Sequence, residues 1–167
     1  FFPGKKLKHV VSHKDPTILF LILAPQDCAQ AHGSKIKNKH VGTFGEIGTF
    51  SFFPGKNLGA FGDAGAICTD NEVLAKRCRM IANHGRLNKY DHEFEGRNSR
   101  LDTIHAAVLN IKLKYLDKWI QKRNNNAINY HIKLQNNKHI KIPKIESYVK
   151  HAFHLYVIQS EKRNELK

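Results

Sequence analysis

The sequence is poor in cysteine and lacks any long apolar run. Its three cysteines, Cys28, Cys68 and Cys78, form no C-x-x-C pair and leave one thiol over, which argues against a disulfide framework or a zinc ribbon. The longest apolar run, Ile18 to Ala24, has seven residues, whereas a helix that crosses a bilayer needs about 20. We therefore expect a cytoplasmic protein without a membrane span, and we interpret the apolar run as a buried strand.

Acidic residues are also scarce. The 167 residues include 14 Asp and Glu against 28 Lys and Arg, so the formal net charge is +14. A charge of this size can indicate an anionic partner such as nucleic acid. The basic residues are nevertheless scattered among Asn and Ile, with no Arg-rich arm and no aromatic RNA-binding signature, so we predict no nucleic-acid partner. The histidines and cysteines show no metal-ligand spacing, and we predict no metal site.

What is present is an ordinary globular composition with alternating strand and helix patterns. Hydrophobic residues make up 41% of the chain and charged residues 25%, values typical of a folded domain, and the length leaves no room for a second complete one. Besides the apolar run, strands are predicted at 48–53, 64–69 and 154–159. Because helical patterns lie between these strands, we predict an α/β fold.

Two helices are predicted from their start signals and apolar periods. The first begins at Asp70 or Asn71, either of which can cap it, and stops before Gly85. The second runs over 99–134, with Ser99 followed by Asp102 as its start signal. One face of the second helix is predicted to be buried, namely Leu101, Ile104, Ala107, Val108, Ile111, Tyr115 and Trp119.

Between two of the predicted strands lies a glycine-rich loop, 54–63, that carries Lys56. Its glycines permit sharp turns and a close approach to a ligand. A lysine in such a loop is usually a solvated turn residue, and only its surroundings, Ser51 five residues before it and Asp27 upstream, point to chemistry. The five letters that end at Lys56 also occur at the start of the chain and end at Lys5, but that copy lacks a counterpart of Ser51 and we assign Lys5 no catalytic role.

Three sequence blocks occur in a distinctive order. They are QDCAQAHG at 26–33, GTFSFFPGKNLG at 48–59 and GRNSRL at 96–101. Together they closely resemble the DegT/StrS family of sugar aminotransferases, over about residues 26 to 160. The resemblance implies part of a fold type I large domain over 26–135, with a mixed, mostly parallel sheet flanked by helices. It also implies the start of a small C-terminal domain over 136–167, and it leaves 1–25 as an unmatched N-terminal segment.

The resemblance implies pyridoxal 5′-phosphate as the cofactor. Lys56 is then the residue that binds the cofactor covalently and later moves a proton as general base and acid. Asp27 keeps the ring nitrogen of the cofactor protonated, because its negative charge favours the N–H form. By the same resemblance, Gln30 contacts the hydroxyl side of the ring and Ser51 donates a hydrogen bond to the phosphate.

The resemblance also implies partners. Asn98 matches the asparagine of a Gly-x-Asn-x-Arg block that reaches the cofactor phosphate of a neighbouring subunit, which implies a homodimer. His84 is a candidate substrate contact. The implied reaction transfers an amino group from an amino acid, with glutamate as the expected donor, to a keto group of a nucleotide-linked sugar. Some family members have histidine in place of the lysine and act as dehydratases, so the presence of Lys56 favours the transaminase.

Two features of the family have no counterpart in the sequence. These are the upstream glycine-rich turn that donates main-chain N–H groups to the phosphate, and most of the small C-terminal domain. We therefore expect the chain to be a fragment that is inactive by itself. The alternative is a catalytically incompetent remnant with a regulatory or interaction role.

Overall fold

The structure is a computed structural model that describes residues 25–166. The strand predicted at 18–24, and Lys5, lie outside the described residues. The described elements, in chain order, are β1 (Gln26–Asp27), β2 (Lys35–Ile36), β3 (Lys39–His40), β4 (Gly48–Ser51), β5 (Gly65–Cys68), α2 (Glu72–Ile81), α3 (Thr103–Leu113), α4 (Leu116–Leu134) and β6 (Val149–Lys150).

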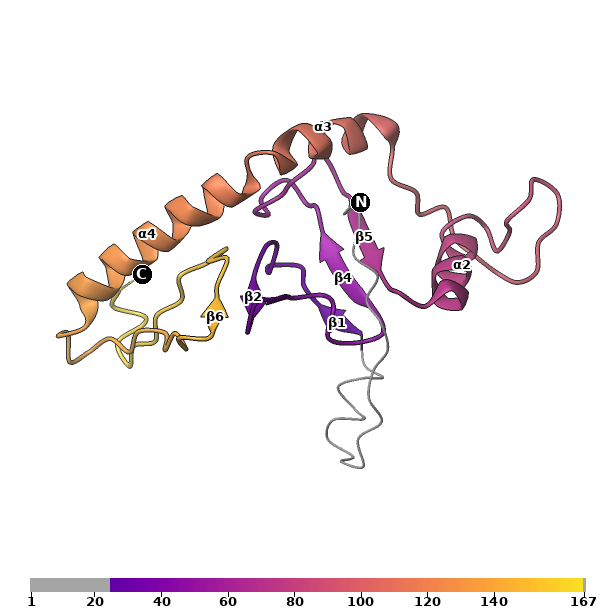
Figure 1. The fold of residues 1–167 in the computed structure, drawn as a ribbon. Helices are drawn as coiled ribbons and strands as arrows, with labels where there is room; N and C mark the ends of the chain where they lie inside the picture. The colour runs from indigo at the N-terminus through magenta and orange to yellow at the C-terminus, as the bar shows by residue number, and fades with distance from the viewer. Residues whose placement is uncertain (1–24, 167) are drawn as a thin grey trace, which may run out of the picture.

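The central sheet has the strand order β1-β4-β5, and α3 lies above it in the view of Figure 1. β1 runs parallel to β4, with Asp27 opposite Thr49, whereas β5 runs antiparallel to β4, with Gly48 opposite Cys68. Gly48 is required at its position, because a Cβ atom there would lie 2.4 Å from the carbonyl oxygen of Gly42. β4 and β5 confirm the strands predicted at 48–53 and 64–69, and each is shorter than the predicted range.

A second sheet has the order β3-β2-β6 and is antiparallel throughout. A two-residue turn at Lys37 and Asn38, both with positive φ, joins β2 to β3 and permits only antiparallel pairing. The mostly parallel sheet that we predicted is therefore not found, since among the described strands only β1 and β4 are parallel. β6, close to the C-terminus, pairs with β2, close to the start of the described residues. The domain limits predicted from the sequence stay a prediction.

Helix α2 begins where its cap predicts. The Asn71 side chain accepts hydrogen bonds from the main-chain N–H groups of Val73 and Leu74, at 3.0 and 3.2 Å. Asn71, and not Asp70, is thus the cap. After the helix ends at Ile81, Gly85 adopts a φ of 76° and donates its N–H to the Met80 carbonyl, which closes the turn.

The single long helix predicted over 99–134 is wrong, because two helices occupy this region. α3 begins at Thr103, with Asp102 rather than Ser99 at the cap position. At the break, Lys114 and Tyr115 donate their main-chain N–H groups to carbonyls three residues back instead of four. This tighter turn redirects the chain, so that α3 and α4 meet at an angle in Figure 1.

The buried face of these helices also differs from the prediction. Ile104 and Ile111, expected inside, are 75% and 61% exposed. α3 is apolar on more than one side, so periodicity alone could not select the face that packs. The core that forms consists of Leu58, Ala60, Leu109, Leu116 and Ile120, with Phe52, Ala64 and Leu113 packed against it.

The strand predicted at 154–159 does not form. Only Gln159 makes a ladder contact, an isolated bridge to Lys141. The Phe153 and His154 carbonyls accept instead from the guanidinium of Arg123 on α4, at 3.2 and 3.1 Å, so a side chain satisfies groups that a strand would present to a neighbour. In Figure 1 this C-terminal segment runs beneath α4.

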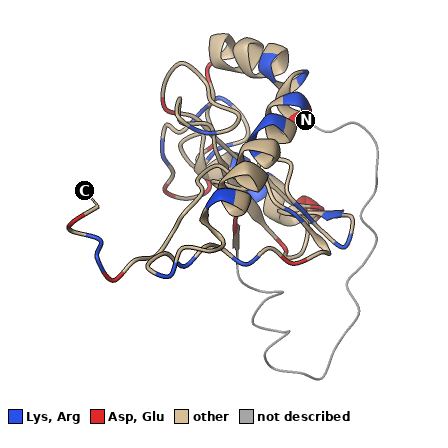
Figure 2. Cartoon of the chain, turned by 90° about the vertical axis from the view of Figure 1, so that its left-hand side faces the viewer, with Lys and Arg blue, Asp and Glu red and all other residues tan. Residues whose placement is uncertain are grey.

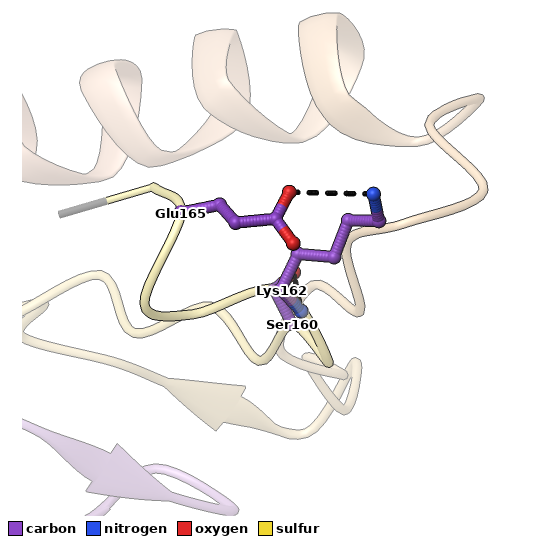
Figure 3. A network of polar contacts seen from close by, with 3 residues as sticks. All are labelled: Ser160, Lys162 and Glu165. Carbon is purple, nitrogen blue, oxygen red and sulfur yellow. Dashed lines mark hydrogen bonds and ion pairs between the residues drawn. The ribbon is translucent and has the colours of Figure 1, made fainter.

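Charged side chains contribute few ion pairs. Figure 2 shows Lys and Arg distributed along the long helices and loops. Within 25–166 the ion pairs are Lys144 with Glu146 and Lys162 with Glu165, and the second forms at 3.3 Å in an exposed turn (Figure 3). Exposed pairs contribute at most about 1 kcal/mol, so the fold depends on its apolar core. No helix in this part of the chain is both long and apolar enough to cross a membrane.

The first prediction concerns this core. Ile120 is fully buried, so Ile120→Ala is expected to lower the free energy of unfolding by about 2–5 kcal/mol, measured by urea denaturation. Ile128→Ala, on the exposed side of the same helix, is the matched control and should change it by less than about 1 kcal/mol. Equal losses in the two variants would contradict the assigned packing.

Candidate functional site

Lys56 ends a tight turn that follows β4. Its main-chain N–H donates to the Phe53 carbonyl at 2.9 Å, and the Ala60 N–H donates to the Phe52 carbonyl at 2.7 Å. Gly59 lies between them at a point where a Cβ atom would be 2.4 Å from the Pro54 carbonyl oxygen, so only glycine fits. The loop is therefore a closed structure, and Lys56 sits in a fixed main-chain position.

Asp27 lies at the carboxyl end of β1, next to β4. One carboxylate oxygen, Oδ1, accepts a hydrogen bond from the Ala29 N–H at 2.9 Å, which orients the exposed side chain. The turn that follows packs on α4, because a Cβ atom on Gly33 would lie 2.4 Å from Ile120 Cδ1. The position of Asp27 thus follows from the β1–β4 pairing and from this contact with the core.

Asp27, Gln30 and Lys56 line one cavity of about 680 Å³. Gln30 and Lys56 are 26 positions apart in sequence, and the parallel β1–β4 pair brings them together. The opposite wall comes from the C-terminal part of the chain, namely Pro143, Lys144, Ile145, His151, Phe153, His154, Leu155 and Val157. A carboxylate, a carboxamide and an amine thus share one concave site with apolar and imidazole groups.

The C-terminal wall is held by side chains from three directions. Asn57, directly after Lys56 and 5% exposed, donates from Nδ2 to the Ala152 carbonyl at 3.0 Å and contacts His154 Nδ1 through Oδ1 at 3.1 Å. The Ala152 N–H donates to the Ser34 hydroxyl at 3.0 Å. From α4, Asn124 donates to the His151 carbonyl at 2.9 Å. The wall is therefore held by the Lys56 loop, by the segment before β2 and by α4.

Burial lowers the pKa values of three histidines near the cavity. For His154 burial is the largest cause, and the charges of Lys56 and Arg123 add to it. Burial alone lowers the pKa of His151. His32 contacts the rings of Phe50 and Phe52, at centroid distances of 5.5 and 5.7 Å, and burial lowers its pKa to about 4. Because the ordinary value is about 6.5, all three rings are mainly neutral at pH 7.

The other predicted site residues do not line this cavity. Ser51 ends β4, and its hydroxyl accepts the Phe53 N–H at 3.3 Å. Asn98 is exposed and pairs with Asn83 in an isolated bridge. His84 has a φ of 60°, and its carbonyl accepts from His92 Nδ1 at 2.8 Å. The roles predicted for these three residues stay predictions.

The C-terminal wall and Asn57 are not among the site residues predicted from the sequence. Residues 151–156 read His-Ala-Phe-His-Leu-Tyr, and this concentration of imidazole and aromatic groups was the available signal for a site. The sequence pattern predicts a strand over 154–159 instead. Asn57 gave no signal of its own, since its partners lie 95 and 97 residues away. No group of three or more potential ligands within 25–166 is placed to hold a metal ion.

Known proteins resemble this chain over most of its length. The sequence model of the DegT/DnrJ/EryC1/StrS aminotransferase family matches residues 16–167, starting upstream of the first motif block at residue 26. A curated relative from Streptomyces venezuelae, named dTDP-3-amino-3,4,6-trideoxy-alpha-D-glucose transaminase, is 42% identical over 142 residues. These residues are 85% of this chain, and they span 38% of the length of that relative.

Two solved structures are similar to this fold. One is S. venezuelae DesV in complex with a ketimine intermediate, with 43% identity and a TM-score of 0.80 over 83% of this chain and 38% of DesV. The other is Bacillus subtilis NtdA with bound cofactor PMP, with 36% identity and a TM-score of 0.65 over 74% of this chain and 29% of NtdA. Because the family model matches residues 16–167, which is most of the sequence, this chain belongs to the DegT/DnrJ/EryC1/StrS aminotransferase family.

Proposed function

We propose that this chain carries part of a pyridoxal-phosphate centre that transfers an amino group from an amino acid to a keto group of a nucleotide-linked sugar. The observation that supports this best is the shared cavity of Asp27 and Lys56, the two groups that such chemistry requires on opposite parts of the cofactor. The name of the S. venezuelae relative, a transaminase of a dTDP-linked sugar, supports the substrate class.

The residues of the cavity fit the ring of the cofactor. Pyridoxal phosphate needs an anionic partner for its ring nitrogen and an amine for its aldehyde, and Asp27 and Lys56 supply these groups on one cavity. Asp27 uses Oδ1 for the Ala29 N–H, which leaves Oδ2 for a pyridinium N–H. Gln30 has both a donor and an acceptor for the ring hydroxyl.

The phosphate end of the site is proposed at the same edge of the sheet. The carboxyl ends of the parallel strands β1 and β4 meet there, so Ser51 ends on the same side as Asp27. We propose Ser51 as a phosphate donor. Asn98 of a second copy of the chain is proposed as a further donor, in a homodimer, and His84 as a substrate contact.

When bound, the cofactor supplies an electron sink that weakens the bonds at the amino-bearing carbon. The chain's own residues then hold and move protons. The Asp27 carboxylate would stabilise the positive charge on the ring nitrogen, and the free Lys56 amine would take a proton from the amino-bearing substrate carbon and deliver it to the C4′ carbon of the cofactor, two bonds away. Phe153, a wall residue that is 7% exposed, contributes apolar surface to that side of the cavity.

The second prediction identifies the lysine that binds the cofactor. When the chain is incubated with pyridoxal phosphate and reduced with borohydride, peptide mass mapping is expected to find the label on Lys56. Lys56→Ala should lose this label, because the amine is removed. Lys76→Ala, an exposed lysine on α2, is the matched control and should keep it. A label found mainly on Lys5 or on another lysine would reject the proposed site.

The third prediction concerns Asp27. Asp27→Asn removes the charge opposite the ring nitrogen, so the concentration of pyridoxal phosphate needed for half-maximal labelling should rise. Asp27 is exposed, and an exposed ion pair contributes up to about 1 kcal/mol, which corresponds to about fivefold or less. Asp70→Asn, outside the cavity, is the control. If Asp27→Asn, Asp70→Asn and the unchanged chain all reach half-maximal labelling at the same concentration of pyridoxal phosphate, a role of Asp27 in binding is excluded.

The fourth prediction tests the phosphate contact. The unchanged chain is expected to label at lower concentrations of pyridoxal phosphate than of pyridoxal, which has no phosphate. Ser51→Ala should reduce that preference by the value of one hydrogen bond, about 1 kcal/mol or about fivefold. Ser147→Ala, exposed and outside the cavity, should leave it unchanged. An undiminished preference in Ser51→Ala would move the phosphate site elsewhere.

A further inference from the structure

The two histidines of the cavity wall have opposite hydrogen-bond arrangements. His151 Nδ1 lies 2.9 Å from the Phe153 N–H, and a main-chain N–H can only donate. Nδ1 of His151 must therefore accept, which means that it carries no hydrogen. A neutral imidazole has one hydrogen, so in His151 this hydrogen is on Nε2, and Nε2 is a donor.

His154 is arranged in the reverse way by Asn57. The Ala152 carbonyl can only accept, so the Asn57 atom that faces it is the amide nitrogen Nδ2, and the atom that faces His154 is the oxygen Oδ1. Because Oδ1 can only accept, Nδ1 of His154 must carry the hydrogen. In the neutral ring, Nε2 of His154 is then bare and is an acceptor.

Both arrangements apply at neutral pH. Burial lowers the pKa of each ring, and the charges of Lys56 and Arg123 lower that of His154 further, so neither ring is protonated twice. Both residues line the cavity that holds Lys56 and Asp27. In the described part of the chain, neither Nε2 atom has a hydrogen-bond partner, and neither is a buried atom without one, so both remain available to a ligand.

We infer that Asn57 is a positioning residue that fixes the His154 tautomer, and that the wall of the cavity presents one donor, His151 Nε2, and one acceptor, His154 Nε2. Such a pair complements a ligand with several hydroxyl groups, because each hydroxyl can both donate and accept. The inference deepens the proposed function, on which its ligand class rests, by assigning the sugar end of the substrate to residues 151–154.

The tautomers can be measured directly in the full 167-residue chain. With ¹⁵N-labelled histidine, the nitrogen chemical shifts distinguish protonated from bare ring nitrogens, and His151→Gln and His154→Gln variants assign the signals. We expect His154 to carry its hydrogen on Nδ1 and His151 on Nε2 at pH 7. The opposite tautomer at His154 in the unchanged chain would overturn the inference, whatever the variants do.

Variants at Asn57 separate positioning from mere packing. Asn57→Leu removes the acceptor, so the His154 Nδ1 signal should move from the protonated toward the bare range. Asn57→Asp keeps an acceptor and adds a charge, so Nδ1 should stay protonated and the pKa of His154 should rise. His151 should be unchanged in both and serves as the internal control. Asn124→Ala loosens the same segment from α4 and should leave the His154 tautomer as it was.

The ligand class is tested with dTDP-glucose and with dTDP as the matched nucleotide. Larger shifts of the two Nε2 signals with dTDP-glucose than with dTDP are expected. Equal shifts, or none with either compound, would overturn the sugar assignment. The tautomer measurement needs no cofactor. Failure to label Lys56 would therefore reject the proposed function, whereas the role of Asn57 is decided by the tautomer measurement alone.

Discussion

The burial of the four residues that follow Lys56 is the constraint on which the site depends. Leu58 and Ala60 enter the core between α3 and α4, and Asn57 is buried beside the C-terminal wall. Lys112 of α3 donates to the Gly59 carbonyl at 2.6 Å and holds the loop from the helix side. A lysine whose next residues are fixed in this way has little main-chain freedom, so its Cα position at the cavity is well defined.

The C-terminal wall depends on the same loop. Its main chain adopts an unfavourable conformation at Phe153, where φ is 41° in a residue with a large side chain. Such a conformation persists only when its surroundings determine it, and here bonds from Asn57, Ser34 and Arg123 do so. The wall and the Lys56 loop are therefore one structural unit, although about 95 residues of sequence separate them.

The sequence predicted those features whose causes are local. The strands around Gly48 and Gly65 and the cap at Asn71 follow from β-propensity and from side-chain to main-chain bonding within a few residues. The blocks containing Asp27 and Lys56 also contain two residues that line the same cavity. The break at Lys114 and the buried face of α3 were missed, because both are decided by packing against Leu58 and Ala60, whose location in the fold no local pattern contains.

Electrostatics explains why geometry, and not protonation, sets the hydrogen-bond pattern of the cavity. A cationic lysine beside half-buried imidazoles disfavours a second positive charge, and burial acts in the same direction, so the rings near Lys56 stay neutral. A neutral imidazole can be either a donor or an acceptor at a given nitrogen, and its other nitrogen decides which. The neutral amide of Asn57 contacts Nδ1 of His154 through Oδ1 and fixes the tautomer without adding a further charge to the cavity.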